Sequence, residues 1–528
     1  MEPTLDRRTF LAAAATGAGG LLLPAPLADA RRRRARRARL PLAREVAFPQ
    51  GIASGQPGTS GITLWTKVQG LERDARLQIE ISPDPDFRRV IYRKPAIARA
   101  SNGFAIHHRA QHSVLKPGER YHYRFVSCTV DGPVGRFTTA RPADSREPAR
   151  IGFFSCQDYE SGYYTPHAAL AEEDDLDLVI CLGDYIYEKH YDDAAVRKDS
   201  TGANGDAEVQ TLPEYRDKYA LYHSDANLRA LRAAHPLLAI WDDHEVEDNW
   251  ARDMPGSATE NPRVPFLERR AAGFQAFFEH MPRRRTPGDR DRIYGSQRIG
   301  ANAELFLLDQ RSYRDDQPCG DQLFAPCTDG AAPGRTLLGA AQKQWLLDAL
   351  GRSGATWKVV GNQVMIMSLD LPAGNAINPD QWDGYAAERR EILERVPTDT
   401  TFVTGDIHTF FAGRVTPSGR QGLGQPAPVA TEFVGGSITS KGVADSATGE
   451  GGREAGKIPA DATLMANNPH FTYANQSSKG YALLEAKPDE LLVTYKGVGT
   501  TQTPTSAPFT LARFRVPRGA AEVENLSV

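Results

Sequence analysis

Side chains that bind metal ions in many proteins follow five short apolar runs in this sequence. The runs span residues 149–154, 176–182, 236–240, 357–360 and 400–403. In the same order, they lead into Cys156, into Asp184 and Tyr187, into Asp243 and His244, into Asn362, and into Asp406 and His408. A thiol, carboxylates, a phenol, an amide and imidazoles can together surround more than one metal ion. We therefore expect a metal centre.

The apolar runs are the elements that must position these side chains. Short runs rich in Val, Ile and Phe indicate buried strands. In open α/β sheets, catalytic groups gather where such strands end, so the ligands are expected to converge on one rim. Each motif alone has an ordinary explanation, because Gly-Asp pairs form turns and buried Cys or Tyr side chains usually pack. Five such motifs, all at strand ends, favour a metal site.

Asp184 and Tyr187 form the most specific pair. A strand-end carboxylate can bridge two cations with its two oxygens, and a tyrosine three residues later can supply a phenolate, which favours Fe(III) over Mg or Ca. Cys156 adds a thiol that a metal would deprotonate. In an extended segment, Asp406 and His408 would share one face, either in a single site or on two different ions.

Oxygen ligands indicate a second, harder site. Asp243 and Asn362 would complete an oxygen-rich shell that suits calcium or another hard divalent cation. Asp242 competes with Asp243 for this role, and the sequence leaves that choice open. Arg311 follows another strand-like run and is a candidate contact for a phosphate group, with a surface ion pair as the alternative.

The N-terminus resembles an export signal. Residues 6–11 read DRRTFL, which is typical of a twin-arginine signal, and a weakly apolar stretch with a final Ala-x-Ala follows it. An ordinary Sec signal is the alternative. We expect residues 1–30 to be a twin-arginine signal peptide and residues 31–44 to be a basic disordered segment. The mature protein is then secreted, periplasmic or cell-wall associated, after passage through the twin-arginine translocase.

Composition narrows the class of protein. The formal net charge is −3 and the pI is about 6.5, so no nucleic-acid-binding surface and no integral membrane segment in the mature chain are expected. The chain is expected to be a monomer. Among its five cysteines, Cys319 and Cys327 bracket a short loop and could form a disulfide in an oxidising compartment, whereas Cys181 is interpreted as a small core residue.

At 528 residues, the chain is too long for one core. Residues 45–142 are interpreted as a β-sandwich, because segments 61–65, 77–81, 106–110 and 121–125 alternate at period two. Around Tyr121 the sequence resembles a fibronectin-type tyrosine corner. Residues 149–516 are interpreted as an α/β domain with helices at 213–221, 265–279 and 342–350, and a closing hairpin at 481–495.

These motifs resemble those of the PhoD-like alkaline phosphatases, a branch of the calcineurin-like metallophosphoesterases. The motifs are Cys156, GDYIY at 183–187, WDDHE at 241–245, GNQ at 361–363 and GDIH at 405–408. Segments 48–55 (FPQGIASG), 381–385 (QWDGY) and 432–437 (EFVGGS) resemble the same family. The resemblance covers nearly the whole mature chain.

The resemblance implies a fold and a ligand set. It implies a fibronectin-like β-sandwich followed by a larger α/β metallophosphoesterase domain with a two-sheet core flanked by helices. Fe(III) would be held by Cys156, Asp184, Tyr187 and His408, and Ca by Asp184, Asn362 and Asp406, so that Asp184 bridges the two. We favour Asp243 over Asp242, because it takes the place of the Asn in the related Gly-Asn-His-Glu motif. His244 then faces the leaving group.

The expected activity is hydrolysis of phosphate monoesters and diesters by a metal-activated water. A phospholipase D-like diesterase acting on phospholipid headgroups is the closest alternative. A non-catalytic wall or adhesion module is a further alternative, since the β-sandwich alone would suggest it, but the ligand set argues against it.

Overall fold

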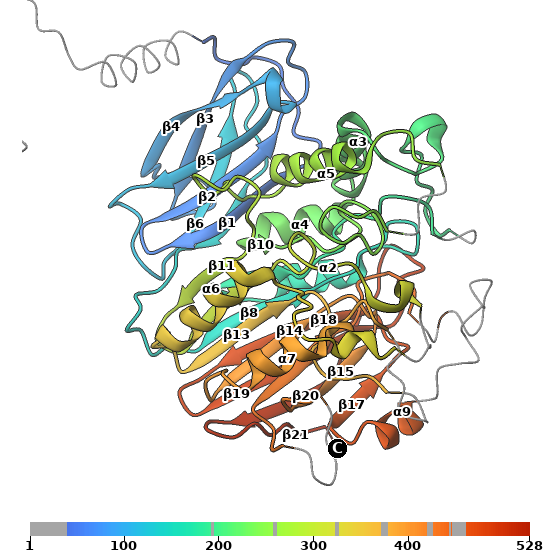
Figure 1. Ribbon diagram of the computed structural model, residues 1–528. Helices are drawn as coiled ribbons and strands as arrows, with labels where there is room; N and C mark the ends of the chain where they lie inside the picture. Colours follow the sequence, from blue (N-terminus) through green and yellow to red (C-terminus); the bar gives the residue numbers. More distant parts are fainter. Residues whose placement is uncertain are drawn as a thin grey trace, which may run out of the picture.

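The structure is a computed structural model, and it describes residues 40–191, 195–256, 261–322, 327–370, 378–419, 426–442, 445 and 461–527. Figure 1 shows a β-sandwich seated on one end of a larger domain of sheets and helices. The expected signal peptide and most of the expected basic segment lie outside the described residues. Within the described ranges, every helix is too short or too polar to cross a bilayer.

The first part of the chain is mostly strands, as expected. One sheet joins β1 (Ile52–Gly58), β2 (Gly61–Lys67) and β5 (Ala105–Gln111), and the other joins β4 (Tyr92–Ala98), β3 (Ala75–Ser82), β6 (Arg120–Val126) and β7 (Gly135–Thr138). Alternate residues of β3, namely Leu77, Ile79 and Ile81, are fully buried between the sheets. The tyrosine corner is confirmed, because the Lys116 amide donates to Tyr121 Oη at 2.8 Å.

The larger domain is built on two mixed seven-stranded sheets within the described residues. The first runs β10 (Leu237–Ala239), β9 (Leu178–Cys181), β8 (Ala149–Phe154), β18 (Gly480–Ala486), β19 (Glu490–Val498), β20 (Pro508–Pro517) and β21 (Glu524–Asn525). The second runs β11 (Gly295–Ile299), β12 (Ala303–Leu307), β13 (Trp357–Asn362), β14 (Thr400–Thr404), β16 (Ala430–Gly435), β15 (Phe410–Val415) and β17 (Phe471–Asn475). Strands β8, β9 and β10 are parallel, as are β13 and β14.

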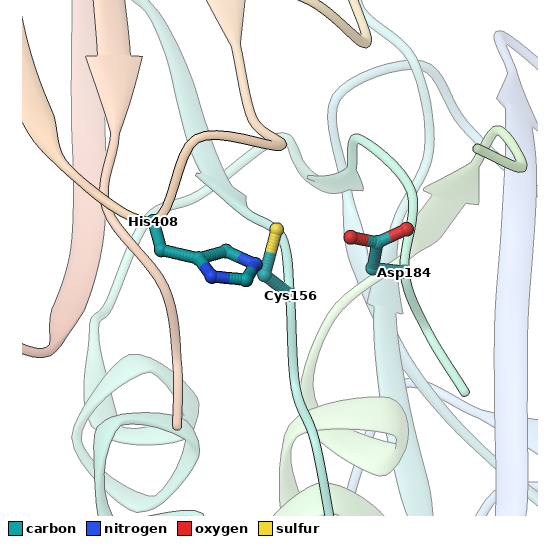
Figure 2. A group of neighbouring side chains, drawn as sticks. All are labelled: Cys156, Asp184 and His408. Carbon is teal, nitrogen blue, oxygen red and sulfur yellow. The ribbon is translucent and has the colours of Figure 1, made fainter. Parts of the chain in front are cut away.

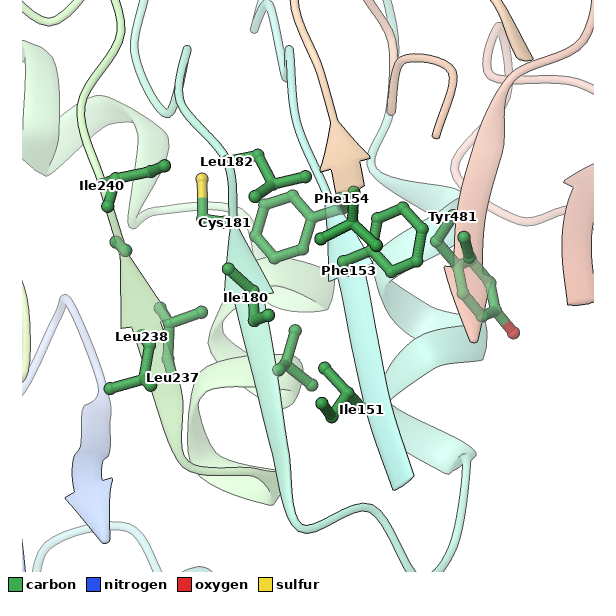
Figure 3. Close-up of a cluster of buried hydrophobic side chains, with 14 of the residues drawn as sticks. Ile151, Phe153, Phe154, Ile180, Cys181, Leu182, Leu237, Leu238, Ile240 and Tyr481 are labelled. Carbon is green, nitrogen blue, oxygen red and sulfur yellow. The ribbon is translucent and has the colours of Figure 1, made fainter. Parts of the chain in front are cut away.

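The two sheets pack face to face over a shared core. Figure 3 shows Phe153, Ile180 and Leu237 projecting from three neighbouring strands of the first sheet. Each such side chain contributes about 1.5–3 kcal/mol when fully buried. Glycines allow the sheets to meet, since a Cβ on Gly435 would lie 2.7 Å from the Phe153 ring.

Helices cover this core. They are α2 (Thr165–Glu172), α3 (Leu212–Tyr222), α4 (Ala226–Ala234), α5 (Phe266–His280), α6 (Gly339–Arg352), α7 (Ala386–Leu393) and α9 (Asp461–Asn467). The three helices expected from the sequence correspond to α3, α5 and α6. On α5, Phe274 stacks on Trp241 with ring centroids 4.1 Å apart, so this helix covers the segment that follows β10.

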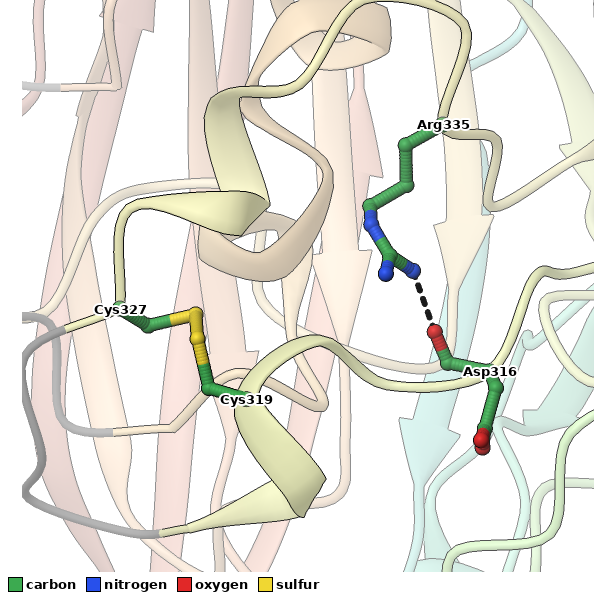
Figure 4. The surroundings of a disulfide bond; sticks show 4 residues. All are labelled: Asp316, Cys319, Cys327 and Arg335. Atoms are coloured by element: carbon green, nitrogen blue, oxygen red, sulfur yellow. Dashed lines mark hydrogen bonds between the residues drawn. A yellow bond between two sulfur atoms is a disulfide. The ribbon is translucent and has the colours of Figure 1, made fainter.

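Two expectations about cysteine are confirmed. Cys319 and Cys327 form a disulfide, shown in Figure 4, and Cys181 is fully buried in the core. In the segment before the disulfide, the Asp316 carbonyl accepts a hydrogen bond from Arg335, and the Gln317 side chain donates to Asp380 at 2.7 Å. The segment before the disulfide therefore supports Asp380, a residue that belongs to the site described next.

Candidate metal centre

The turns that follow the strands carry the expected ligands in a strained backbone. Cys156, Asp184, Asp406 and His408 have φ values of 58, 53, 63 and 55°. A left-handed conformation at a non-glycine residue costs on the order of 1–3 kcal/mol, and such strain clusters at functional sites. Gly183 has a φ of 121°, and a Cβ there would lie 2.4 Å from Asp242 Cβ. The chain needs glycine there to bring two of these turns together.

The ligand atoms gather into three groups, each with all atoms within 4.8 Å of one another. The groups are Cys156, Asp184 and His408; Asp184, Asp243 and His244; and Asp242, Asp243 and Asp406. Figure 2 shows the His408 ring beside the Cys156 thiol, with the Asp184 carboxylate on the other side of Cys156. Asp184 thus joins the first two groups, and Asp243 joins the last two. The expected convergence on one rim is found, and the contributing strands come from both sheets of the expected two-sheet core.

Three buried carboxylate oxygens in these groups accept no hydrogen bond from the described residues. Among the described residues, no hydrogen bond is made by Asp184 Oδ1, Asp242 Oδ2 or Asp243 Oδ1. A buried carboxylate oxygen without a donor is costly, and a cation would satisfy it. The donor set therefore fits metal binding, with room for more than one ion.

At one end of the centre, thiol, phenol and imidazole side chains surround Asp184. Tyr187 Oη lies 3.3 Å from Asp184 Oδ2 and 3.1 Å from His408 Nε2. His408 Nδ1 lies 2.7 Å from the Lys441 carbonyl oxygen, which directs the other ring nitrogen toward Tyr187. We name Cys156, Tyr187 and His408 the soft end.

Burial controls the protonation of the soft end. Burial and the nearby Asp184 carboxylate raise the pKa of Cys156 and of Tyr187 well above their ordinary values. Burial lowers the pKa of His408 to about 4, which keeps the imidazole neutral and able to ligate. The thiol and phenol therefore stay protonated until a cation displaces their protons, so metal uptake here releases protons.

Asp242, Asp243 and Asp406 form the acidic end, together with the fully buried Arg311. The Arg311 guanidinium donates to Asp242 at 2.5 Å and lies 3.6 Å from Asp243 and 3.8 Å from Asp406. Burial opposes the charged form, but Arg311 and His244 lower the pKa of Asp243 to about 2. The surface ion pair considered for Arg311 is thus excluded, because its side chain is 0% exposed.

The backbone after β14 differs from expectation. Residues 406–408 are not an extended segment, since both Asp406 and His408 have positive φ and β14 ends at Thr404. Consequently the two side chains do not share one group. Asp406 joins the acidic end and His408 the soft end. The turn, not strand alternation, divides them.

Asn362 ends β13 and is fully buried. Its carboxamide oxygen accepts hydrogen bonds from Gln310 and, at 3.2 Å, from Trp382 Nε1. Protein donors thus hold this oxygen, and its calcium-ligand role stays a prediction.

His244 has a partner that the sequence did not reveal. Its Nδ1 lies 2.8 Å from Glu188 Oε2, and its ring stacks on Tyr187 at a centroid distance of 4.1 Å. Glu188 also accepts from Tyr191 Oη at 2.6 Å. In the sequence, the one feature that could have drawn attention to Glu188 is its position directly after the GDYIY motif.

Asp380 is a second residue that was missed. It accepts a bidentate pair from Arg311 at 2.8 and 2.9 Å and lies 3.0 Å from Arg314. The next residue, Gln381, donates to Asp406 at 3.2 Å. The segment QWDGY therefore acts as a support for the acidic end, and Asp380 stands immediately before it.

The segment FPQGIASG, at residues 48–55, is connected to the metal centre by hydrogen bonds. Gln50 Oε1 lies 3.0 Å from His223 Nδ1, and His223 Nε2 lies 2.9 Å from Tyr185 Oη. Arg232 donates to the same hydroxyl at 2.6 Å and lies under the Trp65 ring of the sandwich. The sandwich thus reaches, through a buried hydrogen-bond chain, the residue next to Asp184.

Comparison with known proteins identifies the family. A model described as "PhoD-like phosphatase" matches residues 151–495, and one described as "PhoD-like phosphatase, N-terminal domain" matches residues 34–141. The chain belongs to the PhoD-like phosphatases. Alkaline phosphatase D of Bacillus subtilis (strain 168) is 34% identical to it over 489 residues, which are 88% of this chain and 80% of that protein.

Solved structures agree with this family. The structure of PhoD matches with a TM-score of 0.79 and 32% identity, covering 91% of this chain and 92% of that one. A purple acid phosphatase from yellow lupin (Lupinus luteus) seeds has a TM-score of 0.51 at 12% identity, covering 88% of this chain and 75% of that one, which is a likeness of fold alone. This PhoD-like phosphatase is therefore a hydrolase of phosphate esters on a metallophosphoesterase fold, and metal ions are implied at the strand-end centre.

Proposed function

We propose that this protein is an exported phosphatase that hydrolyses phosphate monoesters and diesters at a centre of Fe(III) and Ca(II). The main support is that Asp184 belongs both to a group with thiol and imidazole donors and to a group with Asp243 and His244. Asp243 in turn belongs to a group of three carboxylates. Thiolate, phenolate and imidazole suit iron, and several carboxylates suit calcium. Two chemically different neighbourhoods favour two different ions.

The residues that would hold each ion follow from this division. Iron would be held by Cys156, Asp184, Tyr187 and His408, and calcium by Asp184, Asp243, Asn362 and Asp406. When bound, the ions would supply positive charge for the phosphoryl oxygens and a water of lowered pKa. Arg311 would add a fixed positive charge beside the phosphate.

Protons are handled by the protein itself. Glu188 holds His244 Nδ1, so Nε2 is the nitrogen left to donate to the departing alkoxide. Stacking on Tyr187 fixes the plane of the imidazole ring. A general acid of this kind contributes on the order of 10²–10⁴ in rate.

Export by the twin-arginine route belongs to the same proposal, with a secreted, periplasmic or cell-wall-associated enzyme as the outcome. Residues 6–11 support the route. The Cys319–Cys327 disulfide supports the destination, since disulfides persist in oxidising compartments.

Elemental analysis combined with activity tests the proposal. Protein purified without added metal is expected to contain both iron and calcium, and to hydrolyse p-nitrophenyl phosphate and bis-p-nitrophenyl phosphate. Phosphatidylcholine, supplied as a substrate in the same way, tests whether phospholipid headgroups are hydrolysed instead. Fully active protein that contains neither metal would overturn the proposal.

A further inference from the structure

Two neighbouring cavities lie away from the metal centre, where the sandwich meets α5. One, of about 600 Å³, is lined by the end of α5 and the loop around residues 283–291. The other, of about 630 Å³, is lined by β4 and β5 at the edge of the sandwich. Asn102 and His107 line both, so the two cavities adjoin each other. We name the pair the basic cleft.

Basic side chains outnumber acidic ones in the lining of the cleft. Its lining includes Arg76, Lys94, Arg99, Arg283, Arg284 and Arg290. The acidic lining residues are already used, because Glu279 is bound by Arg216 at 2.7 and 2.8 Å and Asp291 is bound by Arg285. Within the described chain, no carboxylate forms an ion pair with Lys94, Arg284 or Arg290. The cleft therefore carries an excess of positive charge.

Arg283 is held in place in the wall of the cleft. Two of its nitrogens donate to the carbonyls of Ala239, at 3.0 Å, and Ile293. A guanidinium fixed in this way adds positive charge that attracts the oxygens of phosphate groups.

The side chains that line the cleft favour one class of ligand over another. Flexible phosphate chains need charges spaced along a track, whereas nucleobases need open aromatic faces. The Phe278 ring is covered by Arg285, whose guanidinium lies 4.4 Å from its centroid. The Tyr92 ring packs edge-to-face against the rings of His108 and His112, with centroids 5.9 and 6.2 Å apart. The aromatic side chains in the described lining are therefore already engaged.

We propose that the basic cleft binds an extended, flexible chain of phosphate groups and so anchors a polymeric substrate. Arg283 contacts the last residue of β10, and the chain continues from there to Asp242 and Asp243. The cleft thus adjoins the strand that leads into the acidic end. Binding by the cleft is independent of the proposed function, and only its use as a substrate anchor rests on that function.

Fluorescence anisotropy with labelled inorganic polyphosphate tests the proposal on the full chain, and a gel afterwards verifies that the probe is intact. The double variant Arg284→Gln/Arg290→Gln is expected to bind at least about tenfold more weakly. Because it lacks two positive charges, the slope of log Kd against log salt concentration should fall by up to about two. The matched control is Arg88→Gln/Arg352→Gln, which removes the same charge from side chains that are 82% and 73% exposed outside the cleft. It should bind as the unaltered protein does.

Equal binding of polyphosphate by the two double variants would overturn the proposal that the basic cleft is the binding site. Binding of oligothymidine as tightly as polyphosphate, through the same arginines, would overturn the choice of a phosphate chain. Hydrolysis of p-nitrophenyl phosphate should be unchanged in the cleft variant. If the unaltered protein binds polyphosphate but hydrolyses no phosphate ester, the proposed function fails while the binding site stands.

Discussion

The soft end and the acidic end of the candidate centre both gather side chains that follow strand ends, but they balance charge differently. At the soft end, burial keeps Cys156 and Tyr187 protonated and His408 neutral. At the acidic end, the carboxylates lie around a buried Arg311. The soft end can therefore stay uncharged without a metal. At the acidic end, burial raises the pKa of Asp242 and, to about 7, that of Asp406, whereas Arg311 and His244 hold Asp243 in its charged form. The same rim can in this way present two different sites.

Removing Asp184, which links the soft end to Asp243 of the acidic end, should have the largest effect. Asp184→Asn keeps the size of the side chain but loses the charge, so turnover and retention of both metals should disappear together. Enzyme assays and elemental analysis of the same sample measure this. If the variant kept one metal at full stoichiometry, the two ends would not be joined through Asp184.

Loss of the arginine should affect only the acidic end and the fold around it. Arg311→Met leaves Asp242 and Asp380 buried without their guanidinium, and breaking a buried pair costs about 3–5 kcal/mol. Urea unfolding of the metal-stripped protein measures the loss. The exposed pair at Arg352 supplies the control, since Arg352→Met should change stability by less than about 1 kcal/mol.

Changing the phenol should mark the soft end selectively. Tyr187→Phe removes the phenolate donor, so any visible iron–phenolate absorbance should vanish while calcium content stays the same. Absorption spectra recorded with metal analysis provide the readout. Unchanged absorbance would show that Tyr187 is not an iron ligand.

Glu188→Gln should lower turnover without altering either metal. The amide cannot stabilise a protonated His244 as a carboxylate does, and a fall in kcat of about tenfold to a hundredfold is expected. Steady-state kinetics with p-nitrophenyl phosphate give kcat and KM separately. A change in KM alone, or a loss of metal, would contradict a role in holding His244.

The smallest effect is expected at the interface between the two domains. Burial lowers the pKa of Lys67, which lies 3.0 Å from His280, to about 8. The unfolded chain keeps this proton up to about pH 10.5, so this lysine makes the folded state gain stability as pH rises from about 8 to 10.5. In Lys67→Met this gain should be absent, as measured by the difference in unfolding free energy between the two proteins across that range.

Particular residues show how far the sequence could lead. Strand ends, helices and the tyrosine corner were predicted because hydrophobic period and turn residues are local signals. Glu188 and Asp380 were missed because an isolated carboxylate has no local signature, and its partner is set by folding. Arg311 was left between two roles for the same reason. Residues 406–408 were misassigned as extended, since a left-handed turn at Asp and His leaves little trace in the sequence.

The amino-acid sequence by itself determined the order of domains, the strands that end at the rim and the side chains carried there, since each depends on neighbours along the chain. Only the tertiary structure decided which strands of the two sheets meet at the rim, that Asp406 and His408 separate, and that Arg311 is buried among carboxylates. These features depend on contacts between segments far apart in sequence, where packing and the cost of burying charge select one arrangement.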